Sequence, residues 1–179
     1  MSDPNEARET VDAGEFGAWR AMLRAALRGE RDADVPCGSC SACCTSSQFV
    51  LIEPDETDAL AHIPSELLFP APRRPIGHVV LGYDERGHCP MLRDGRCSIY
   101  EHRPRTCRTY DCRVFAAADV APAEETKVAI TRRVRQWRFR YAGEDDRRAH
   151  DALRATAATL QADGVDPGEA AVRAATAGG

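Results

Sequence analysis

The order of apolar and polar positions predicts helices towards both ends of the chain and short strands in its middle. Residues 12–29 repeat apolar side chains at the three- and four-residue spacing of one buried helical stripe, and Gly29 stands where a C-terminal cap is expected. The same spacing predicts helices over 123–141 and 145–161. From residue 162 onward the chain is rich in Ala, Gly and Asp, and we expect a disordered tail.

The middle of the chain predicts less regular structure. Residues 48–52 and 77–83 are short apolar runs rich in β-branched side chains, as expected of strands. A turn at 84–87 leads into the sequence HCPML, so we expect a small hairpin there. Residues 55–63 predict a short helix that begins with acidic residues. Residues 67–77 are proline-rich and are expected to be irregular.

Eight cysteines are the unusual feature of this 179-residue chain. Apolar residues make up 43% of the sequence and charged residues 29%, which is ordinary for a folded soluble protein. The N-terminus lacks the basic-then-apolar order of a secretory signal, so we expect a cytoplasmic protein. Disulfides are rare in the reducing cytosol, and many cysteines there indicate metal binding or catalysis rather than a secreted disulfide framework. The cysteines are Cys37, Cys40, Cys43, Cys44, Cys89, Cys97, Cys107 and Cys112.

The first four cysteines form the pattern C-x-x-C-x-x-C-C. Two residues between Cys37 and Cys40 let a tight turn direct both sulfurs to one metal, as in zinc knuckles and iron–sulfur sites. Cys43 and Cys44 are adjacent, and because neighbouring side chains diverge we do not expect both to bind one ion. Either they serve different metals, or one is a spare, redox-active or structural thiol. Eight thiols suffice for two four-sulfur sites, and one site with additional cysteines is equally allowed.

Arginine and histidine side chains near the later cysteines are further candidates. A cluster held by four thiolates carries negative charge, which Arg103, Arg105 and Arg108 are suited to offset while tuning its potential. Of these, Arg103 and Arg108 are assigned to the cofactor site. His88 and His102 are candidate nitrogen ligands for a mixed Cys/His zinc site, although eight thiols make histidine unnecessary. No role is assigned to His62, His78 and His150.

The order of three cysteine-bearing segments resembles that of a known family. The segments are PCGSCSACC, HCPML and GRCSIYEHRPRTCRTYDC. Together they resemble the YkgJ-type cysteine-cluster family, also described as the CxxCxxCC zinc- or iron-chelating domain, over about residues 36–115. A related branch, the flagellin lysine N-methylases, implies iron–sulfur-linked methyl transfer, but those proteins are considerably longer, and we do not carry that activity over. The resemblance implies metal ligands from Cys37, Cys40, Cys43 or Cys44, Cys89, Cys97 and Cys107, with Cys112 at the edge of the pattern.

The predicted fold class is α+β: a small, irregular, metal-stabilised cysteine-cluster core with a short β-hairpin, packed by N- and C-terminal helices. We expect an N-terminal helix and flexible lead over 1–35, the cysteine-cluster domain over 36–115, C-terminal helices over 116–161 and the disordered tail over 162–179. Because the central part is rich in Gly, Pro and polar residues, its order is expected to depend on the metal.

The expected cofactor is an iron–sulfur cluster or zinc. Iron–sulfur is favoured because eight clustered cysteines with flanking arginines exceed what one structural zinc ion needs. We therefore predict a redox, electron-transfer or accessory module. The alternatives are a structural zinc-binding interaction module and an iron–sulfur oxidoreductase or methyl-transfer enzyme that acts with a partner. The chain has no G-x-G-x-x-G, phosphate-loop or H-E-x-x-H motif, and no catalytic residue is assigned.

Charge and hydropathy restrict the partners. The net charge of −4 argues against nucleic acid, because phosphate binding requires an excess of Lys and Arg. The arginine-rich segment 131–140 is more typical of a solvated helix with its aromatic side chains turned inward than of an RNA-binding face. No apolar run approaches the roughly 18 residues of a membrane span, so we expect no membrane association. A protein partner and the oligomeric state stay open.

Overall fold

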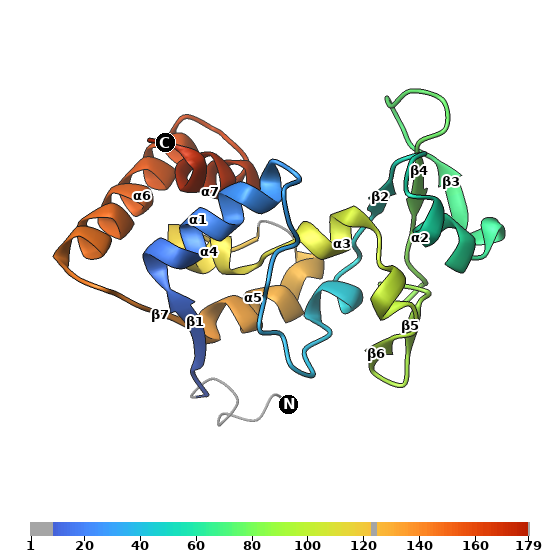
Figure 1. The fold of residues 1–179 in the computed structure, drawn as a ribbon, viewed down its shortest axis with the longest axis horizontal. Helices are drawn as coiled ribbons and strands as arrows, with labels where there is room; N and C mark the ends of the chain where they lie inside the picture. The colour runs from blue at the N-terminus through green and yellow to red at the C-terminus, as the bar shows by residue number, and fades with distance from the viewer. Residues whose placement is uncertain (1–8, 123–124, 179) are drawn as a thin grey trace. The chain divides into compact units, whose positions relative to one another are not determined.

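Two compact units make up the residues that the computed structural model describes, 9–122 and 125–178 (Figure 1). The cysteine unit is continuous and runs from Cys37 to Tyr110. The helical unit combines the segment before it with the segment that begins at Asp111. Helices and short strands occur in both units, so the predicted α+β class is confirmed.

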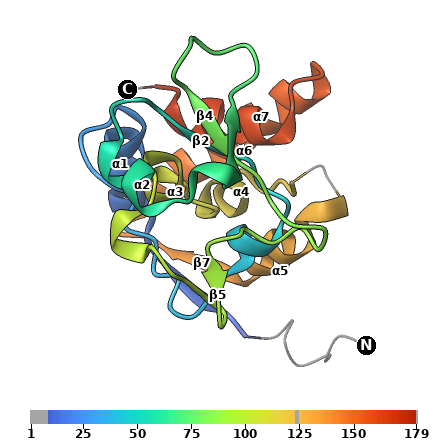
Figure 2. The ribbon, with the colours of Figure 1, turned by 90° about the vertical axis from the view of Figure 1, so that its right-hand side faces the viewer.

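The helical unit is a group of helices with a two-stranded parallel sheet. Its elements are β1 (Val11–Glu15), α1 (Phe16–Leu27), α4 (Arg113–Ala118), the 3₁₀ turn η5 (Glu125–Lys127), α5 (Val128–Gln136), β7 (Trp137–Arg140), α6 (Glu144–Ala162) and α7 (Pro167–Thr176). α4 packs against α6 and α7, and the last two lie side by side (Figures 1 and 2). β1 and β7 pair in parallel, with Val11 opposite Trp137.

Aromatic and small side chains form the core of the helical unit. Phe16, Trp19 and Leu23, which belong to the predicted stripe of α1, are at most 2% exposed and pack with Leu153 and Ala157 of α6. Burying a large apolar side chain stabilises the fold by about 1.5–3 kcal/mol, so this stripe fixes α1 in place. Among the described residues, none of the helices combines the length and apolar character needed to span a membrane.

The helix predicted over 123–141 is shorter in the structure. It ends at Gln136, and Trp137–Arg140 continue as β7. Trp137 is 3% exposed, so the side chain expected on the helical stripe is buried, but from a strand. Pairing with β1 overrides the local helical spacing, which a sequence pattern does not reveal. Residues 123 and 124 lie outside the described residues.

Residues 167–176 form helix α7, which differs from the disordered tail expected there. The Asp166 side chain caps this helix by accepting hydrogen bonds from the N–H groups of Gly168 and Glu169, and Pro167 occupies the first helical position. The sequence Asp-Pro-Gly-Glu therefore marks the start of a helix. The Ala-, Gly- and Asp-rich composition of this region led to the prediction of disorder instead. Gly179 lies outside the described residues. The alanines of α7 that are buried in the core are Ala170, Ala171, Ala174 and Ala175.

A buried ion pair joins three segments of the helical unit. Arg113 Nη2 lies 2.8 Å from Asp111 Oδ2, and the two side chains are 4% and 0% exposed. The indole N–H of Trp19 donates to the same carboxylate at 3.0 Å. The Arg113 guanidinium also donates to the carbonyl oxygens of Ala13 at 3.1 Å and Asp34 at 3.0 Å. The network thus connects the two parts of the chain that flank the cysteine unit.

The cysteine unit contains a three-stranded antiparallel sheet and several short turns. Its elements are η2 (Ala42–Thr45), β2 (Val50–Ile52), α2 (Thr57–His62), η3 (Ser65–Leu67), β3 (Leu68–Pro70), β4 (Val79–Leu81), β5 (Leu92–Arg93), β6 (Arg96–Cys97), η4 (Tyr100–His102) and α3 (Arg105–Thr109). β4 lies between β2 and β3 and pairs with both. The apolar cluster of this unit, its small core, consists of Val50, Ile52, Ile63, Leu81, Met91 and Ile99.

The strands predicted over 48–52 and 77–83 are confirmed as β2 and β4, and the helix predicted over 55–63 as α2. The predicted hairpin between 77–83 and HCPML is wrong, because β4 pairs with β2 and β3 instead. The hairpin is β5–β6, whose connecting residues Asp94 and Gly95 have φ of +47° and +76°, as a type I′ turn requires. β3 lies within the segment expected to be irregular.

Candidate metal centre

The C-x-x-C-x-x-C-C segment folds as two consecutive tight turns. The N–H of Cys40 donates to the carbonyl of Cys37 at 3.0 Å, which closes a turn between the first two thiols. Gly38 within it has φ of +57°, a left-handed conformation that favours glycine. Cys43 and Cys44 follow on the 3₁₀ turn η2. One short loop therefore carries four thiols.

Backbone hydrogen bonds hold this loop next to Cys89. The N–H of Cys89 donates to the carbonyl of Cys44 at 2.7 Å, and the N–H of Ser47 donates to the carbonyl of Gly87 at 2.9 Å. Gly87 has φ of +78°, and a Cβ there would lie 2.4 Å from Ser47 Oγ, so glycine permits this close approach. Two cysteine-bearing segments far apart in the sequence are thereby held side by side.

Cys97 and Cys107 are carried by a hairpin and a short helix of the same unit. The N–H of Leu92 donates to the carbonyl of Cys89 at 2.9 Å, and Leu92 pairs with Cys97 across β5–β6. Cys107 lies on α3, which Thr106 fixes to β2 by donating its hydroxyl to a backbone carbonyl at 2.6 Å. Cys89, Cys97 and Cys107 all pack against the apolar cluster of the cysteine unit.

Five thiols of the cysteine unit, those of Cys43, Cys44, Cys89, Cys97 and Cys107, lie close enough for the charge on one to affect others. Burial raises the pKa of Cys89, and the charges of Cys97 and Cys43 raise it further. Burial likewise raises the pKa of Cys107 to about 12, with contributions from the same two thiols and from Cys89. Without a metal, Cys89 and Cys107 are therefore protonated at neutral pH, because their thiolates would repel the neighbouring charges. A thiophilic metal supplies a compensating positive charge and displaces the thiol protons.

Cys43 and Cys44 differ in protonation although they are neighbours. Their Sγ atoms are 4.0 Å apart. The hydrogen bond from the Cys44 thiol, with a smaller contribution from the charge of Arg103, lowers the pKa of Cys43 to about 7. The same hydrogen bond raises the pKa of Cys44. Of the pair, Cys43 is therefore the first to ionise near neutral pH, while Cys44 keeps its proton.

We predict that in the metal-free protein Cys43 is more reactive than Cys89 and Cys107. Its alkylation by iodoacetamide should accelerate through about pH 7, whereas Cys89 and Cys107 stay protonated there and should react slowly. Replacing Cys44 with alanine removes the hydrogen-bond donor and should move the midpoint for Cys43 to higher pH. Peptide mass mapping after timed alkylation measures each rate. Equal rates for Cys43 and Cys107 at neutral pH would contradict this assignment.

Arg103 is the cationic side chain that acts on this group of thiols. Its charge lowers the pKa of both Cys43 and Cys107 as a secondary cause. The guanidinium lies over the Tyr100 ring, with Cζ 3.5 Å from the ring centroid, and its buried Nε has no hydrogen-bond partner among the described residues. A buried donor without an acceptor is costly, and an anionic thiolate centre would provide one. The donor set and this guanidinium therefore both fit a thiolate-bound metal.

The other two arginines considered for the cofactor have different surroundings. Arg105 pairs with Glu53 and, at 3.0 Å, with Asp55, so carboxylates already compensate its charge. The charge of Arg108 acts on Asp58, where it adds to a lowering of the carboxyl pKa that is mainly due to a hydrogen bond from His102. A role for Arg108 beside a cofactor stays a prediction.

Cys112 belongs to the helical unit, whereas the other seven cysteines belong to the cysteine unit. Its Sγ accepts a hydrogen bond from the indole N–H of Trp137 at 3.3 Å. All eight cysteines, which lie within the described range 9–122, are free thiols. The ligand role of each of the eight cysteines, Cys112 included, stays a prediction.

Three histidines make hydrogen bonds that involve the backbone and stabilise the structure around them. The backbone N–H of His88 donates to the Asp84 carboxylate at 2.9 Å within the turn before Cys89. His78 Nδ1 lies 3.1 Å from the carbonyl oxygen of Pro75. His150 is buried in the helical unit, where its Nε2 lies 2.8 Å from the carbonyl of Ala117. These contacts are structural.

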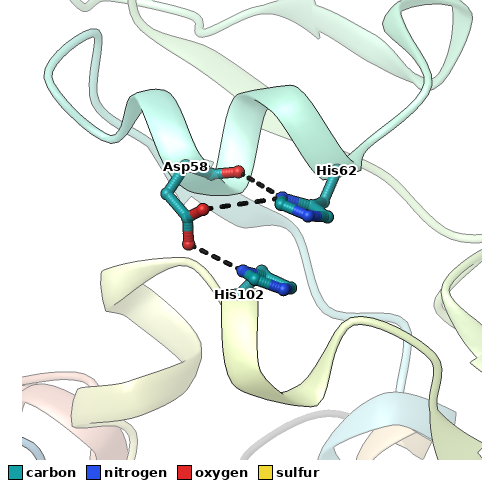
Figure 3. Close-up of side chains that lie close together, drawn as sticks. All are labelled: Asp58, His62 and His102. Atoms are coloured by element: carbon teal, nitrogen blue, oxygen red, sulfur yellow. Dashed lines mark hydrogen bonds and ion pairs between the residues drawn. The ribbon is translucent and has the colours of Figure 1, made fainter.

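Sequence reasoning missed a second group of metal-ligand side chains, formed by Asp58, His62 and His102 (Figure 3). One ligand atom from each lies within 4.8 Å of the others, and the two imidazole rings stack with their centroids 3.5 Å apart. The available signal was the four-residue spacing of Asp58 and His62, which puts both on one face of a helix. His102 could not be added from the sequence, because only the fold brings η4 to α2.

One family model matches the chain over residues 36–133, more than half of its length, and is described as "CxxCxxCC: Putative zinc- or iron-chelating domain". The chain belongs to the CxxCxxCC family. The match covers the whole cysteine unit and continues through α4 into α5, further than the resemblance over 36–115 indicated. The predicted cofactor, iron–sulfur or zinc, agrees with this zinc- or iron-chelating family, and the YkgJ branch stays a prediction. No curated protein and no solved structure matches the chain.

Proposed function

We propose that this CxxCxxCC protein binds an iron–sulfur cluster in its cysteine unit and serves as a redox or electron-transfer module. The observation that carries the proposal is the mutual electrostatic influence of five thiols. Four of these thiols are proposed as ligands, a number that suits an iron–sulfur cluster or a zinc ion. The Cys44 thiol and Arg103 beside them are suited to tune a redox centre and therefore favour the cluster. Family membership supports the chelation of zinc or iron. The five thiols are those of Cys43, Cys44, Cys89, Cys97 and Cys107.

Four of these residues, Cys43, Cys89, Cys97 and Cys107, are the proposed ligands. They come from a loop, a turn, a hairpin and a short helix. Backbone hydrogen bonds join the first three segments, and Cys89, Cys97 and Cys107 pack against the same apolar cluster, which supports this choice. Cys43 is chosen over Cys44 because the Cys44 thiol donates to it. When bound, an iron–sulfur cluster supplies one-electron transfer, and the protein supplies the sulfur ligands and their surroundings.

Two groups beside the proposed ligands are suited to tune a cluster. The Cys44 thiol donates a hydrogen bond to Cys43. Arg103 adds a positive charge that acts on Cys43 and Cys107. Hydrogen bonds and positive charge near ligand sulfurs favour the more negative, reduced state of a cluster, so both groups are expected to raise its reduction potential.

Anaerobic purification, followed by analysis of iron, zinc and acid-labile sulfide, tests the proposal. We expect iron and sulfide in similar amounts and a visible absorption that dithionite bleaches. Cys44→Ala and Cys43→Ala form a matched pair of neighbours. The first removes the thiol donor and should retain the cluster at a lower potential, and the second removes a proposed ligand and should lose the cluster. Stoichiometric zinc without sulfide would overturn the proposal and favour the structural zinc module instead.

A further inference from the structure

We propose that Asp58, His62 and His102 form a second metal site that takes a borderline divalent cation such as Zn²⁺. Both imidazole Nδ1 atoms point towards Asp58 (Figure 3). His102 Nδ1 lies 2.9 Å from Asp58 Oδ2, and His62 Nδ1 lies 3.7 Å from Asp58 Oδ1. The site is independent of the thiols, because its donors are nitrogen and oxygen.

Two elements of the cysteine unit position the ligands. Asp58 and His62 lie one turn apart on α2, and His102 is the last residue of η4. The backbone N–H of His102 donates to the carbonyl of Ile99 at 2.8 Å, and Ile99 belongs to the apolar cluster of the unit. His102 is therefore presented by a turn that is anchored in the core, so little chain ordering is needed to assemble the three ligands.

The donor set selects the cation. Two imidazoles and one carboxylate suit zinc and related transition ions, whereas Mg²⁺ and Ca²⁺ prefer sites built from oxygen. The charge of Arg108 also acts on Asp58, so the site has little net negative charge with which to hold a hard cation. The three side chains are 40–68% exposed, which leaves the remaining coordination positions open to water.

Binding requires a local exchange of partners. The metal replaces the proton at His102 Nδ1 and takes its lone pair. From an imidazolium this proton passes to solvent, and for a neutral ring a proton is taken up at Nε2 instead, so that the bound ring stays a neutral imidazole. His62 gives up the 2.8 Å hydrogen bond between its Nδ1 and the Asp58 carbonyl, so a rotation of its ring accompanies binding. Because His102 lies between Cys97 and Cys107 in the chain, the ion ties α2 to the segment that carries two of the proposed cluster ligands.

Calorimetric titration of Zn²⁺ into full-length, tag-free protein that holds its thiolate-bound metal tests this site. Wild type should bind one further equivalent, and Asp58→Asn, His62→Ala and His102→Ala should each weaken that affinity by at least about tenfold. Mg²⁺ at the same concentration should not bind. His78→Ala is the matched control. His78 belongs to the same unit, but its imidazole contacts the carbonyl of Pro75 and not Asp58, His62 or His102. It should bind Zn²⁺ as wild type does.

Co²⁺ distinguishes this site from the thiols. Bound at Asp58, His62 and His102, it should show d–d absorption without sulfur-to-cobalt charge transfer. Absence of the further equivalent, unchanged affinity in the three variants, or charge-transfer bands for that equivalent would overturn the proposal. The metal bound to the thiols is also measured in every variant. Loss of metal from the cysteines is therefore distinguished from loss of metal at Asp58, His62 and His102. The nearly isosteric Asp58→Asn keeps the test valid if a histidine replacement disturbs folding.

Discussion

Replacing Cys97 with serine is expected to abolish metal binding at the thiols and to unfold the cysteine unit while the helical unit stays folded. Cys97 is half-buried in β6, packs against the apolar cluster, and its charge acts on Cys89 and Cys107. A structural metal contributes on the order of 10–16 kcal/mol of apparent binding free energy, as much as the whole stability of a small domain. A core as small as this apolar cluster does not offset that loss.

Limited proteolysis and tryptophan fluorescence separate the two units in this experiment. Both tryptophans, Trp19 and Trp137, belong to the helical unit, so their emission reports on that unit alone. The Cys97→Ser protein should be cut within 37–110 and keep a native emission spectrum. A variant with full metal content and wild-type protease resistance would refute the ligand role.

Cys112→Ser is the matched control, because it makes the same chemical change outside the cysteine unit. We expect it to retain the metal and the protease resistance of wild type. Its hydrogen bond from Trp137 passes to the serine oxygen or is lost, which affects only the helical unit. Loss of metal from Cys112→Ser would instead show that Cys112 is a ligand, and it would contradict the choice of this variant as a control.

Replacing Asp111 with alanine should lower the free energy of unfolding of the helical unit by about 3–5 kcal/mol, because it leaves the Arg113 guanidinium buried without its counter-charge. The same change removes the acceptor of the Trp19 indole N–H, which is also buried. Urea unfolding followed by tryptophan fluorescence measures the effect, since Trp19 itself contacts the substituted carboxylate.

Arg140→Ala is the control for Asp111→Ala. Arg140 pairs with Asp12 on the surface of the same unit, with Nε 3.2 Å from Oδ2, and both side chains are largely exposed. Solvent screens such a pair, so its removal should leave the unfolding transition nearly unchanged. A double variant, Asp111→Leu with Arg113→Met, should be more stable than Asp111→Ala, because no charge remains buried. If Asp111→Ala and Arg140→Ala lower the free energy of unfolding equally, burial does not make the Asp111–Arg113 pair more important than an exposed ion pair.

Local patterns predicted much of the fold. The stripe of α1, the strands β2 and β4 and the helix α2 follow from apolar spacing, and the structure confirms them. The errors come from long-range pairing: Trp137 continues into a strand because β1 is available as its partner. Likewise, the turn at 84–87 suggested that β4 pairs with the segment that follows it, but β4 pairs with β2 and β3. The helix α7 was missed because its apolar face is made of alanine, which carries little hydrophobic signal.

The candidate site was predicted unevenly. Cysteine spacing selected all eight cysteines as candidate ligands, because closely spaced cysteines are rare and chemically specific, and which of them bind metal stays a prediction. The asymmetry between Cys43 and Cys44 depends on one sulfur–sulfur hydrogen bond and on Arg103, and no sequence spacing reports such contacts. The Asp58, His62 and His102 group was missed for the same reason, since its members come from two separate elements.

The cysteine unit is connected to the helical unit at both of its ends, Cys37 and Tyr110. Near these ends, Arg113 donates a hydrogen bond to the carbonyl of Asp34, which holds the two connecting segments of the helical unit together. The cysteine unit is therefore an insertion, and its unfolded form is a closed loop rather than a free tail. Closing a loop of that length costs entropy on the order of 4 kcal/mol, which opposes the fold of the helical unit only while the insertion is unfolded. Because the metal is expected to keep the insertion folded, removing it should lower the melting temperature of the host helices through chain connectivity.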